Sequence, residues 1–592
     1  MNKQQPVAVA MDQPAIIRQL TIERFRGIRE LRWNPGAGLN VILGGGDVGK
    51  TTVLEAIGLL LNPSNAAVLS EADYYNRDSG AGFVIQGVFS LSTSADIGQQ
   101  QKFAWPWEWN GTDAVVPSSD DPDDTPTPTS PVYRLQVRGT PELELAWEVV
   151  QPNDEVEGLS SAVRRAIGIV RLASDERSDR DLRLVYGSAL DRLLGDQGLR
   201  ARIGQQVAGM DLNAKLGEDA KKSLGRLDDA MRDASLPSGL ELGLTSAQGI
   251  SIGALIGLLA TKGDARLPLA SWGAGTRRMA TLEIAASTQS KTRISVIDEA
   301  ERGLEPYRVR RLIENLRSEP TQSFVTTHSP VAVHAATEGS LWYLDSRGRI
   351  GELVRASIWQ QQQRDPETFL ARLALIAEGP TEVGFLSYLL AKAINGSPLD
   401  HGIRVCNGQG TPAVLELLEA LNKGGLTFGG FVDGTNSAPT RWRALKESMQ
   451  GLLFQWDTGC TEERVISLVD QTKLLELVND ADGSPDHERR MTLVDRLGIS
   501  DKGLDAIVAA APDLRALIIA AASGSAAGAP DEDTAKTWKK HGKRWFKSEE
   551  GGRELAEKAF TLGVWPALKP TILPFLNAVR TFIGQPEIQD LQ

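Results

Sequence analysis

The sequence predicts an α/β protein made of two successive α/β parts, each interrupted by helical sequence. An apolar run at Leu39–Leu43 leads through glycines into a helical pattern, and a second run, Leu373–Ala377, also leads into a helix. Between them, Arg293–Glu299 is a short apolar run that ends in two carboxylates. Short apolar runs followed by helical spacing are typical of buried parallel strands.

The composition is that of a globular protein. The 592 residues are 41% hydrophobic and 24% charged, which corresponds to about three or four domain-sized units. The net charge of −12 means that any nucleic-acid contact must be local or carried by metal ions. Cys406 and Cys460 are far apart and match no metal-ligand spacing, which fits a reducing cytoplasm. No signal peptide and no membrane span is expected, since no apolar run reaches about 18 residues.

The stretch Gly44–Thr51 satisfies the phosphate-binding pattern G-x-x-x-x-G-K-[ST]. Glycines let backbone N–H groups approach phosphate oxygens, and the helix that follows points its positive end at the same anion. Lys50 would add a charge near the β and γ phosphates, and the Thr51 hydroxyl would ligate Mg²⁺. The predicted ATP-binding residues of this loop are Gly44, Gly46, Gly49, Lys50, Thr51 and Thr52.

Four later segments supply the remaining parts of an ATPase. In the strand that ends at Asp298–Glu299, Asp298 would hold Mg²⁺ through water and Glu299 would polarise the attacking water. Upstream lies Ser271–Arg278, where Ser271, Gly273 and Gly275 begin a helix that could grip a γ-phosphate. Gly303–Pro306 follows, and a further strand ends at His328, which could sense the γ-phosphate.

In this order and spacing, the set resembles the ABC-type ATPases of the structural-maintenance and recombination group. The resemblance implies that Ser271–Arg278 is the signature motif, Gly303–Pro306 the D-loop and His328 the switch histidine. Gln86 would be the Q-loop glutamine, although it lies inside a strand pattern. In that family two heads meet and each signature caps the nucleotide of the other, so a homodimer or higher homo-oligomer is implied.

Helical sequence of mixed charge extends from about Leu159 to Ser235. It is too short for a long coiled-coil arm, and packing or dimerisation is the favoured interpretation. The acidic, proline-rich stretch 117–131 is expected to be a surface loop. The charge run Arg171–Asp181 is expected to be a solvated face, with an arginine near the nucleotide as the alternative.

The second α/β part carries acids at the ends of two strands. Glu378 and Glu382 follow Leu373–Ala377, and Asp433 follows another apolar run. The carboxyl ends of parallel strands meet at one edge of a sheet, where carboxylates repel one another unless a divalent metal joins them. Two metals there would suit an in-line phosphoryl displacement.

This arrangement resembles a Toprim domain, whose marks are a glutamate after the first strand and D-x-D after a later one. Here Asp433-Gly434-Thr435 keeps only the first aspartate. The second metal ligand could be supplied by Thr435 or Asn436, or by Glu462 or Glu463.

Near the C-terminus, Lys536–Lys547 holds six lysines and arginines, no acids and three aromatic residues. In an acidic chain this segment is the candidate for phosphate contacts, with base stacking by Trp538, Trp545 and Phe546. A solvated face is the alternative. Lys547 could bring a charge to the scissile phosphate.

An ABC ATPase with a helical insertion followed by a Toprim domain resembles the overcoming-lysogenization-defect (OLD) family of nucleases over residues 15–592. That resemblance implies DNA cleavage with Mg²⁺ or Mn²⁺, a role in phage defence or DNA repair, and assistance by a lysine, here Lys547. Some members work beside a UvrD-like helicase. The expected parts are ATPase at 1–158 and 237–360, a helical insertion at 159–236, Toprim at 361–480 and 536–592, and a helical insertion and linker at 481–535.

The sequence therefore predicts an ATP-binding and hydrolysing, metal-dependent DNA endonuclease. Its proposed metal ligands and catalytic acids in the second part are Glu378, Glu382, Asp433 and Glu462. The alternative is a DNA-binding ATPase clamp or damage sensor with an inert Toprim domain, which the incomplete D-x-D favours. A topoisomerase would need a nucleophilic tyrosine on a separate DNA-binding module, and none of the seven tyrosines lies in a recognisable one.

Overall fold

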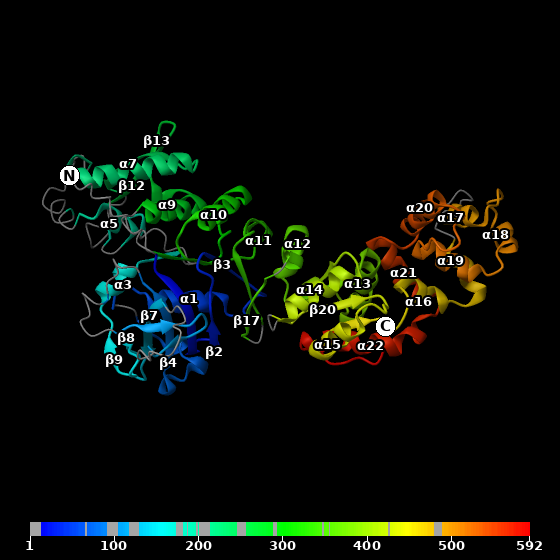
Figure 1. Cartoon of the computed structure of the whole chain (residues 1–592). Coiled ribbons are helices and arrows are strands. Elements are labelled where there is room, and N and C mark those ends of the chain that lie inside the picture. The colour runs from blue at the N-terminus through cyan, green and yellow to red at the C-terminus, as the bar shows by residue number, and fades with distance from the viewer. Residues whose placement is uncertain are drawn as a thin grey trace, which may run out of the picture. The chain divides into compact units, whose positions relative to one another are not determined.

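The protein is described here by a computed structural model (Figure 1). It describes residues 14–65, 68–91, 97, 105–117, 130–172, 181–185, 188–196, 199, 213–244, 256–287, 293–345, 348–354, 356–423, 427–478 and 488–591. Most of the 117–131 stretch and residues 173–180 of the charge run therefore lie outside the described residues. The chain divides into two compact units, one of Met1–Leu43 with Asp47–Glu352 and the other of Gly44–Gly46 with Leu353–Gln592.

The N-terminal unit is organised around a six-stranded sheet whose order is β10-β14-β15-β3-β16-β17. All neighbouring strands are parallel except β16 and β17, which are antiparallel. The strands are β3 (Leu39–Leu43), β10 (Ile169–Leu172), β14 (Ile294–Ile297), β15 (Ser323–Thr326), β16 (Ser340–Leu344) and β17 (Ile350–Glu352). Every residue of β3, β14 and β15 is buried, including the polar residues Asn40, Ser295 and Ser323, as expected for strands covered on both faces.

A second, antiparallel sheet completes the core of this unit. It consists of β1 (Ile16–Phe25), β2 (Ile28–Trp33), β4 (Phe83–Ser90), β5 (Trp107–Trp109), β6 (Ala114–Val115), β7 (Ser130–Gly139), β8 (Leu145–Val150) and β9 (Val156–Gly158). Helix α1 (Lys50–Leu60) contacts strands of both sheets, and its apolar side chains share one buried cluster with them. The helix that begins at the phosphate-binding loop is thus fixed between two layers.

The rest of the unit has its own hydrophobic cluster, formed by helices and the three-stranded sheet β11-β12-β13. Its strands are β11 (Ser238–Leu244), β12 (Ile256–Lys262) and β13 (Ala265–Pro268). Among the described residues, the helices of the unit besides α1 are α3 (Ser161–Ile167), α5 (Ala189–Leu194), α7 (Glu218–Asp233), α9 (Ala274–Ser287), α10 (Pro306–Ser318) and α11 (Pro330–Ala335).

The predicted helical stretch from Leu159 to Ser235 is only partly helical. Helices α3, α5 and α7 lie in it, but β10 pairs with β14 at the edge of the parallel sheet. This strand has four residues and follows α3 directly, so its local sequence continues an apparently helical pattern. Pairing with a strand distant in the chain outweighs that local pattern.

The C-terminal unit contains a four-stranded parallel sheet of order β19-β18-β20-β21. Its strands are β18 (Leu373–Ala377), β19 (Ile403–Asn407), β20 (Gly429–Val432) and β21 (Leu453–Gln455). Its helices are α12 (Ala356–Arg364), α13 (Pro380–Ile394), α14 (Thr411–Lys423), α15 (Pro439–Ser448), α16 (Thr461–Ser467), α17 (Glu488–Leu497), α18 (Leu504–Ala510), α19 (Leu514–Ser523), α20 (Glu532–His541), α21 (Glu549–Thr561) and α22 (Trp565–Phe582). The α/β prediction is confirmed for both units.

Among the described helices, none alone has the length and apolar character needed to cross a membrane; α18 and α19 meet that test only as a pair, bent by 106°.

Helices α13 and α21 cross with their backbones in contact. A Cβ atom on Gly384 would lie 1.8 Å from the carbonyl oxygen of Glu549, and one on Gly552 would lie 2.0 Å from that of Thr381. Both positions therefore require glycine. The crossing fixes the start of α21 beside the start of α13, where Glu382 lies.

We expect Gly552→Ala to destabilise the protein by about 1–3 kcal/mol, because the helix backbones must separate to admit the methyl group. In an open helix the same change would stabilise by about 1 kcal/mol. Urea unfolding measures the difference, with Gly396→Ala as the control, since no atom lies within 4 Å of a Cβ there. Unchanged stability of Gly552→Ala would contradict the close crossing.

Candidate functional site

Three adjacent strands of the N-terminal unit bring the predicted ATPase residues to one edge of the sheet. Strand β3 lies next to β15, and β15 lies next to β14. Lys50 follows β3, Asp298 follows β14 and His328 follows β15. The Thr51 hydroxyl donates a hydrogen bond to Asp298 Oδ1 at 3.2 Å, so the two predicted magnesium-binding side chains are adjacent.

The phosphate-binding loop has the backbone conformation that its glycines predict. Gly44 has φ 144° and Gly49 has φ 99°, both in the region that favours glycine. Gly49 is the N-cap of α1, so Lys50, Thr51 and Thr52 form the first turn of that helix. Lys50 is buried, and burial lowers the pKa of its ammonium group while Asp298, Asp47 and the glutamates after Asp298 oppose the change. A bound phosphate would add further negative charge beside this ammonium group.

The structure adds positioning residues that the motif search did not identify. Thr326 donates its hydroxyl to Asp298 Oδ1 at 2.6 Å and accepts the amide N–H of Glu299 at 2.9 Å. Glu301 accepts the Thr327 hydroxyl at 2.6 Å and the amide N–H of His328 at 2.7 Å. These bonds tie the strand end that carries His328 to the one that carries Asp298. In the sequence, the two threonines that directly precede His328 could have indicated these positioning residues.

Glu299 has φ 49°, in the left-handed region that a glutamate rarely adopts. Strain of this kind collects where a side chain must be aimed for function. The conformation therefore supports the predicted role of Glu299 at the attacking water, and that role remains a prediction.

The predicted signature residues lie at the start of α9. Ser271 and Gly273 are exposed, whereas Gly275 is buried. Gly275 packs so closely on the backbone of Gly303 that a Cβ atom there would lie 2.0 Å from the Gly303 carbonyl oxygen. From the next turn, Arg278 donates a hydrogen bond to the backbone oxygen of Asp298. Helix α9 thus contacts both the predicted D-loop and the Asp298 strand of its own chain, while Ser271 and Gly273, just before the helix, are exposed.

Gln86 lies in the antiparallel sheet and not at the end of a parallel strand. It lies in the middle of β4, between β1 and β7, and its amide donates to Gln136 at 3.1 Å. The structure gives it a cross-strand partner within the antiparallel sheet.

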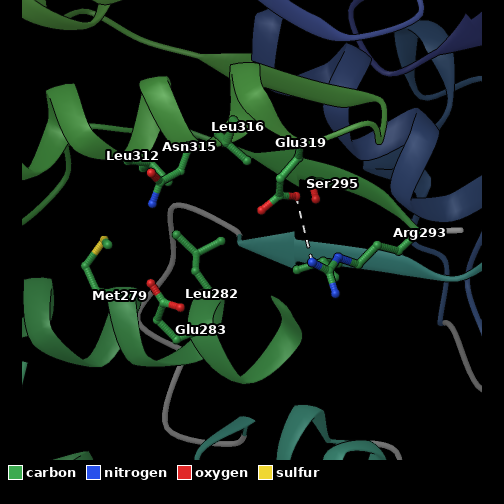
Figure 2. Close-up of a pocket in the computed structure, with 10 residues that line it drawn as sticks. Met279, Leu282, Glu283, Arg293, Ser295, Leu312, Asn315, Leu316 and Glu319 are labelled. Carbon is green, nitrogen blue, oxygen red and sulfur yellow. Dashed lines mark ion pairs between the residues drawn. The ribbon is translucent and has the colours of Figure 1, made fainter. Parts of the chain in front are cut away.

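A small polar cavity of about 60 Å³ lies between α9 and α10 (Figure 2). Glu283 and Glu319 face it from the two helices, and Arg293 forms an ion pair with Glu319 at 3.8 Å. Burial raises the pKa of Glu283. The volume suits one or two water molecules and is far below the several hundred Å³ of a ligand site, about 300 or more.

The C-terminal unit brings the four predicted acids together. The amide N–H of Asp433 donates to Glu378 Oε2 at 3.0 Å, which joins the ends of β18 and β20. Glu382 lies in the first turn of α13, and Glu462 in the first turn of α16. Glu382 and Glu462 are both buried. The predicted alternative ligand Glu462 is therefore part of this acidic cluster of Glu378, Glu382, Asp433 and Glu462.

Three threonine hydroxyls hold the acidic cluster in place. Thr411 donates to Glu378 Oε1 at 2.5 Å, and Thr461 donates both its amide N–H and its hydroxyl to Asp433 Oδ1. The Thr381 hydroxyl lies 3.0 Å from Glu462 Oε1 and 2.9 Å from the carbonyl oxygen of Phe546. None of these threonines was identified from the sequence, because a single hydroxyl has no recognisable spacing.

The carboxylates of the cluster repel one another in a buried space. Burial, then the charges of Glu382, Glu378 and Glu462, raise the pKa of Asp433 to about 9. Burial and the charge of Glu462 raise the pKa of Glu382 to about 7. Groups whose charged forms are disfavoured to this extent call for a cation or a proton.

The donor chemistry of the acidic cluster fits a divalent metal, since hard cations prefer carboxylate oxygens. Within the described residues, however, no three acidic, histidine or cysteine side chains are arranged to hold a metal ion as they stand. The acids would have to rotate toward a common point on binding.

The Lys536–Lys547 segment lies beside the cluster, but its aromatic residues do not face solvent. Trp538, Trp545 and Phe546 are 8%, 3% and 0% exposed and belong to the core, so the expected base stacking is wrong. Lys547 is exposed, and the preceding carbonyl is the one bonded to Thr381. The backbone before Lys547 is thus tied to the neighbour of Glu382.

Comparison with known proteins adds one family match. Residues 39–333 match the family described as "AAA domain, putative AbiEii toxin, Type IV TA system". The matched residues lie almost entirely in the N-terminal unit, which is therefore similar to an AAA domain over that range. This supports the predicted ATP-binding half. No curated protein matches the chain.

Similar solved structures include an SmcHead bound to the C-winged helix domain of ScpA, at 14% identity and TM-score 0.36, covering 58% of this chain and 99% of that one. An Smc head domain with an extended coiled coil, bound to the C-terminal domain of ScpA derived from Pyrococcus furiosus, has 12% identity and TM-score 0.35 and covers 57% and 96%. The recombination mediator protein RecF with ATP has 14% identity and TM-score 0.33 and covers 59% and 100%.

We expect Asp433→Asn to stabilise the protein when chelator keeps divalent metal away. The folded-state pKa of Asp433 lies above its ordinary value, so the folded state keeps a proton that the unfolded chain releases, and stability falls as pH rises toward 9. The amide is neutral at every pH, so folding no longer requires this proton uptake, and its oxygen can still accept both bonds from Thr461. The melting temperature at pH 8 in EDTA should rise by about 2–4 °C for each kcal/mol of relief.

The control is Glu447→Gln, which removes the charge of an exposed acid on α15. A lower melting temperature for Asp433→Asn than for this control, under the same conditions, would contradict the repulsion.

Proposed function

We propose that the chain is an ATP-binding and hydrolysing, divalent-metal-dependent DNA endonuclease of the OLD type, with its C-terminal unit acting as a Toprim domain. One observation carries the proposal: four acids meet at the carboxyl edge of a parallel sheet, with the pKa of Asp433 raised to about 9. The resemblance of the whole chain to that nuclease family supplies DNA as the substrate.

In this proposal Glu378 and Asp433 are the principal metal ligands, and Glu382 and Glu462 complete the set. Both hydrogen bonds from Thr461 go to Asp433 Oδ1, so its second oxygen can turn to a cation. A bound divalent metal would activate water and stabilise charge on the phosphate oxygens. The crossing of α13 and α21 would hold Lys547 near the scissile phosphate, where its charge stabilises the phosphorane-like transition state.

The N-terminal unit is proposed to hydrolyse ATP at Lys50, Thr51, Asp298 and Glu299. The exposed start of α9 at Ser271 supports capping of the nucleotide by a second copy of the chain, and hence a homodimer. Because Arg278 joins α9 to the Asp298 strand, a change at the capping surface would be felt at the hydrolytic residues of the same head.

A second candidate is a DNA-binding ATPase clamp whose C-terminal unit is catalytically inert. The absence of a ready-made metal-ligand set within the described residues favours it, as does Thr435 at the position of the second aspartate of D-x-D. In that case the protonated carboxyl groups would be structural only.

Plasmid cleavage tests the two candidates. We expect wild type to nick or linearise supercoiled plasmid in Mg²⁺ or Mn²⁺. Glu378→Ala should lose at least about 100-fold in rate, because the remaining acids cannot hold the metal in position. Its melting temperature should stay close to that of wild type. Glu447→Gln serves as the matched control for a removed carboxylate and should cut normally.

Lys50→Ala, with and without ATP, reports how nucleotide is coupled to cutting. Robust cleavage by Glu378→Ala would refute the site assignment. Intact ATP hydrolysis without any cleavage by wild type would favour the clamp.

A further inference from the structure

The surface of α20 and the following turn η10 (Gly542–Arg544) is cationic on one side and anchored on the other. Spacing of three and four residues places two sets of side chains on opposite faces. One face buries Trp538, His541 and Trp545. The other exposes a set that we call the basic ridge, Lys539, Lys540, Lys543 and Arg544.

The buried face is clamped by α17, which lies beside α20 in Figure 1. Trp545 donates its indole N–H to Thr492 at 2.8 Å. Arg496 donates to His541 Nδ1 at 3.1 Å and lies over the Trp538 ring at 4.6 Å. These contacts hold the ridge in one orientation, so little conformational entropy is lost when an anion binds it.

The four ridge side chains form no ion pair within the described residues, and Asp495 of α17 pairs with His541 on the buried face at 3.3 Å. Lys536, which precedes the basic ridge on α20, differs from the ridge residues because it pairs with Glu532 and Asp533. The nearest acids along the chain beyond the ridge, Glu549 and Glu550, are exposed in the first turn of α21, where they favour the helix N-terminus. The ridge thus gathers four exposed cations in one short segment of a chain whose net charge is −12.

The ridge leads to the acidic cluster. Three residues after Arg544 comes Lys547, and the carbonyl of Phe546 is hydrogen bonded to Thr381, the neighbour of Glu382. A polyanion lying on the ridge would therefore reach the acidic cluster along the same backbone segment.

We propose that the basic ridge binds the phosphodiester backbone of duplex DNA and delivers it to the acidic cluster. The choice of DNA rests on the proposed nuclease function. Proteins that bind single strands add exposed aromatic rings on which bases stack. Here the three aromatic residues of the segment are buried, so the ridge can contact DNA only through its positive charges. It would therefore bind the phosphates of the DNA backbone regardless of base sequence.

Binding of a labelled DNA duplex, measured by fluorescence anisotropy at increasing NaCl in EDTA, tests the proposal in a Glu378→Ala background that cannot cut. The variant Lys539→Gln/Lys540→Gln/Lys543→Gln removes three ridge charges. We expect the slope of log affinity against log salt to fall by about 1 for each phosphate that the variant no longer neutralises. Affinity at moderate salt should fall by about tenfold or more.

The control removes three exposed cations elsewhere in the same unit, as Lys423→Gln/Arg443→Gln/Lys446→Gln. These lie toward the C-terminal ends of α14 and α15, and helices that connect parallel strands end at the sheet edge away from the carboxylates. The control should bind as the parent does. Melting temperatures verify that both triple variants are folded.

Equal affinity and slope for ridge variant and control, or no duplex binding by the parent, would overturn the proposal. Preference for a single strand or an RNA duplex of the same length would also overturn it. Failure of the nuclease proposal is separate: if wild type never cuts plasmid but duplex binding depends on the ridge, the ridge proposal stands and the nuclease proposal fails.

Discussion

Repulsion among buried carboxylates is the constraint on which the C-terminal unit depends. Parallel pairing of β18 with β20 brings Glu378 and Asp433 to one edge, and the first turns of α13 and α16 add Glu382 and Glu462. Without a cation this arrangement opposes folding at neutral pH, since the pKa of Asp433 is raised to about 9. The glycine crossing of α13 and α21 and the threonine hydrogen bonds keep the acids together despite that cost.

The N-terminal unit also buries a charged side chain at its predicted site, but there the buried group is a cation. A buried lysine lies at the start of α1, close to the acids that follow β14, and the hydroxyl of Thr326 at the end of β15 holds Asp298 in place. Adjacent strands of one sheet carry all of these groups, so their relative positions are fixed by backbone hydrogen bonds. Both units thus place charged side chains at strand ends and use neighbouring hydroxyls to orient them.

Much of this could be predicted from the sequence because parallel strands leave a local signature. The short runs before Gly44, Asp298, His328 and Glu378 are rich in apolar residues, and each is a buried strand. What could not be predicted depends on partners distant in the chain. Strand β10 is held by β14, the Gly384–Gly552 crossing joins segments far apart, and Trp538 packs under Arg496 of α17, to which no sequence pattern connects it.

The most direct test of the central claim is a count of Mn²⁺ bound to the nucleotide-free chain by electron paramagnetic resonance. We expect saturable binding by wild type that is abolished in Asp433→Asn. Asp298→Asn, which alters only the predicted ATPase site, should leave that binding in place. No Mn²⁺ bound by wild type, or equal binding by wild type and Asp433→Asn, would contradict the assignment of the acidic cluster as a metal site.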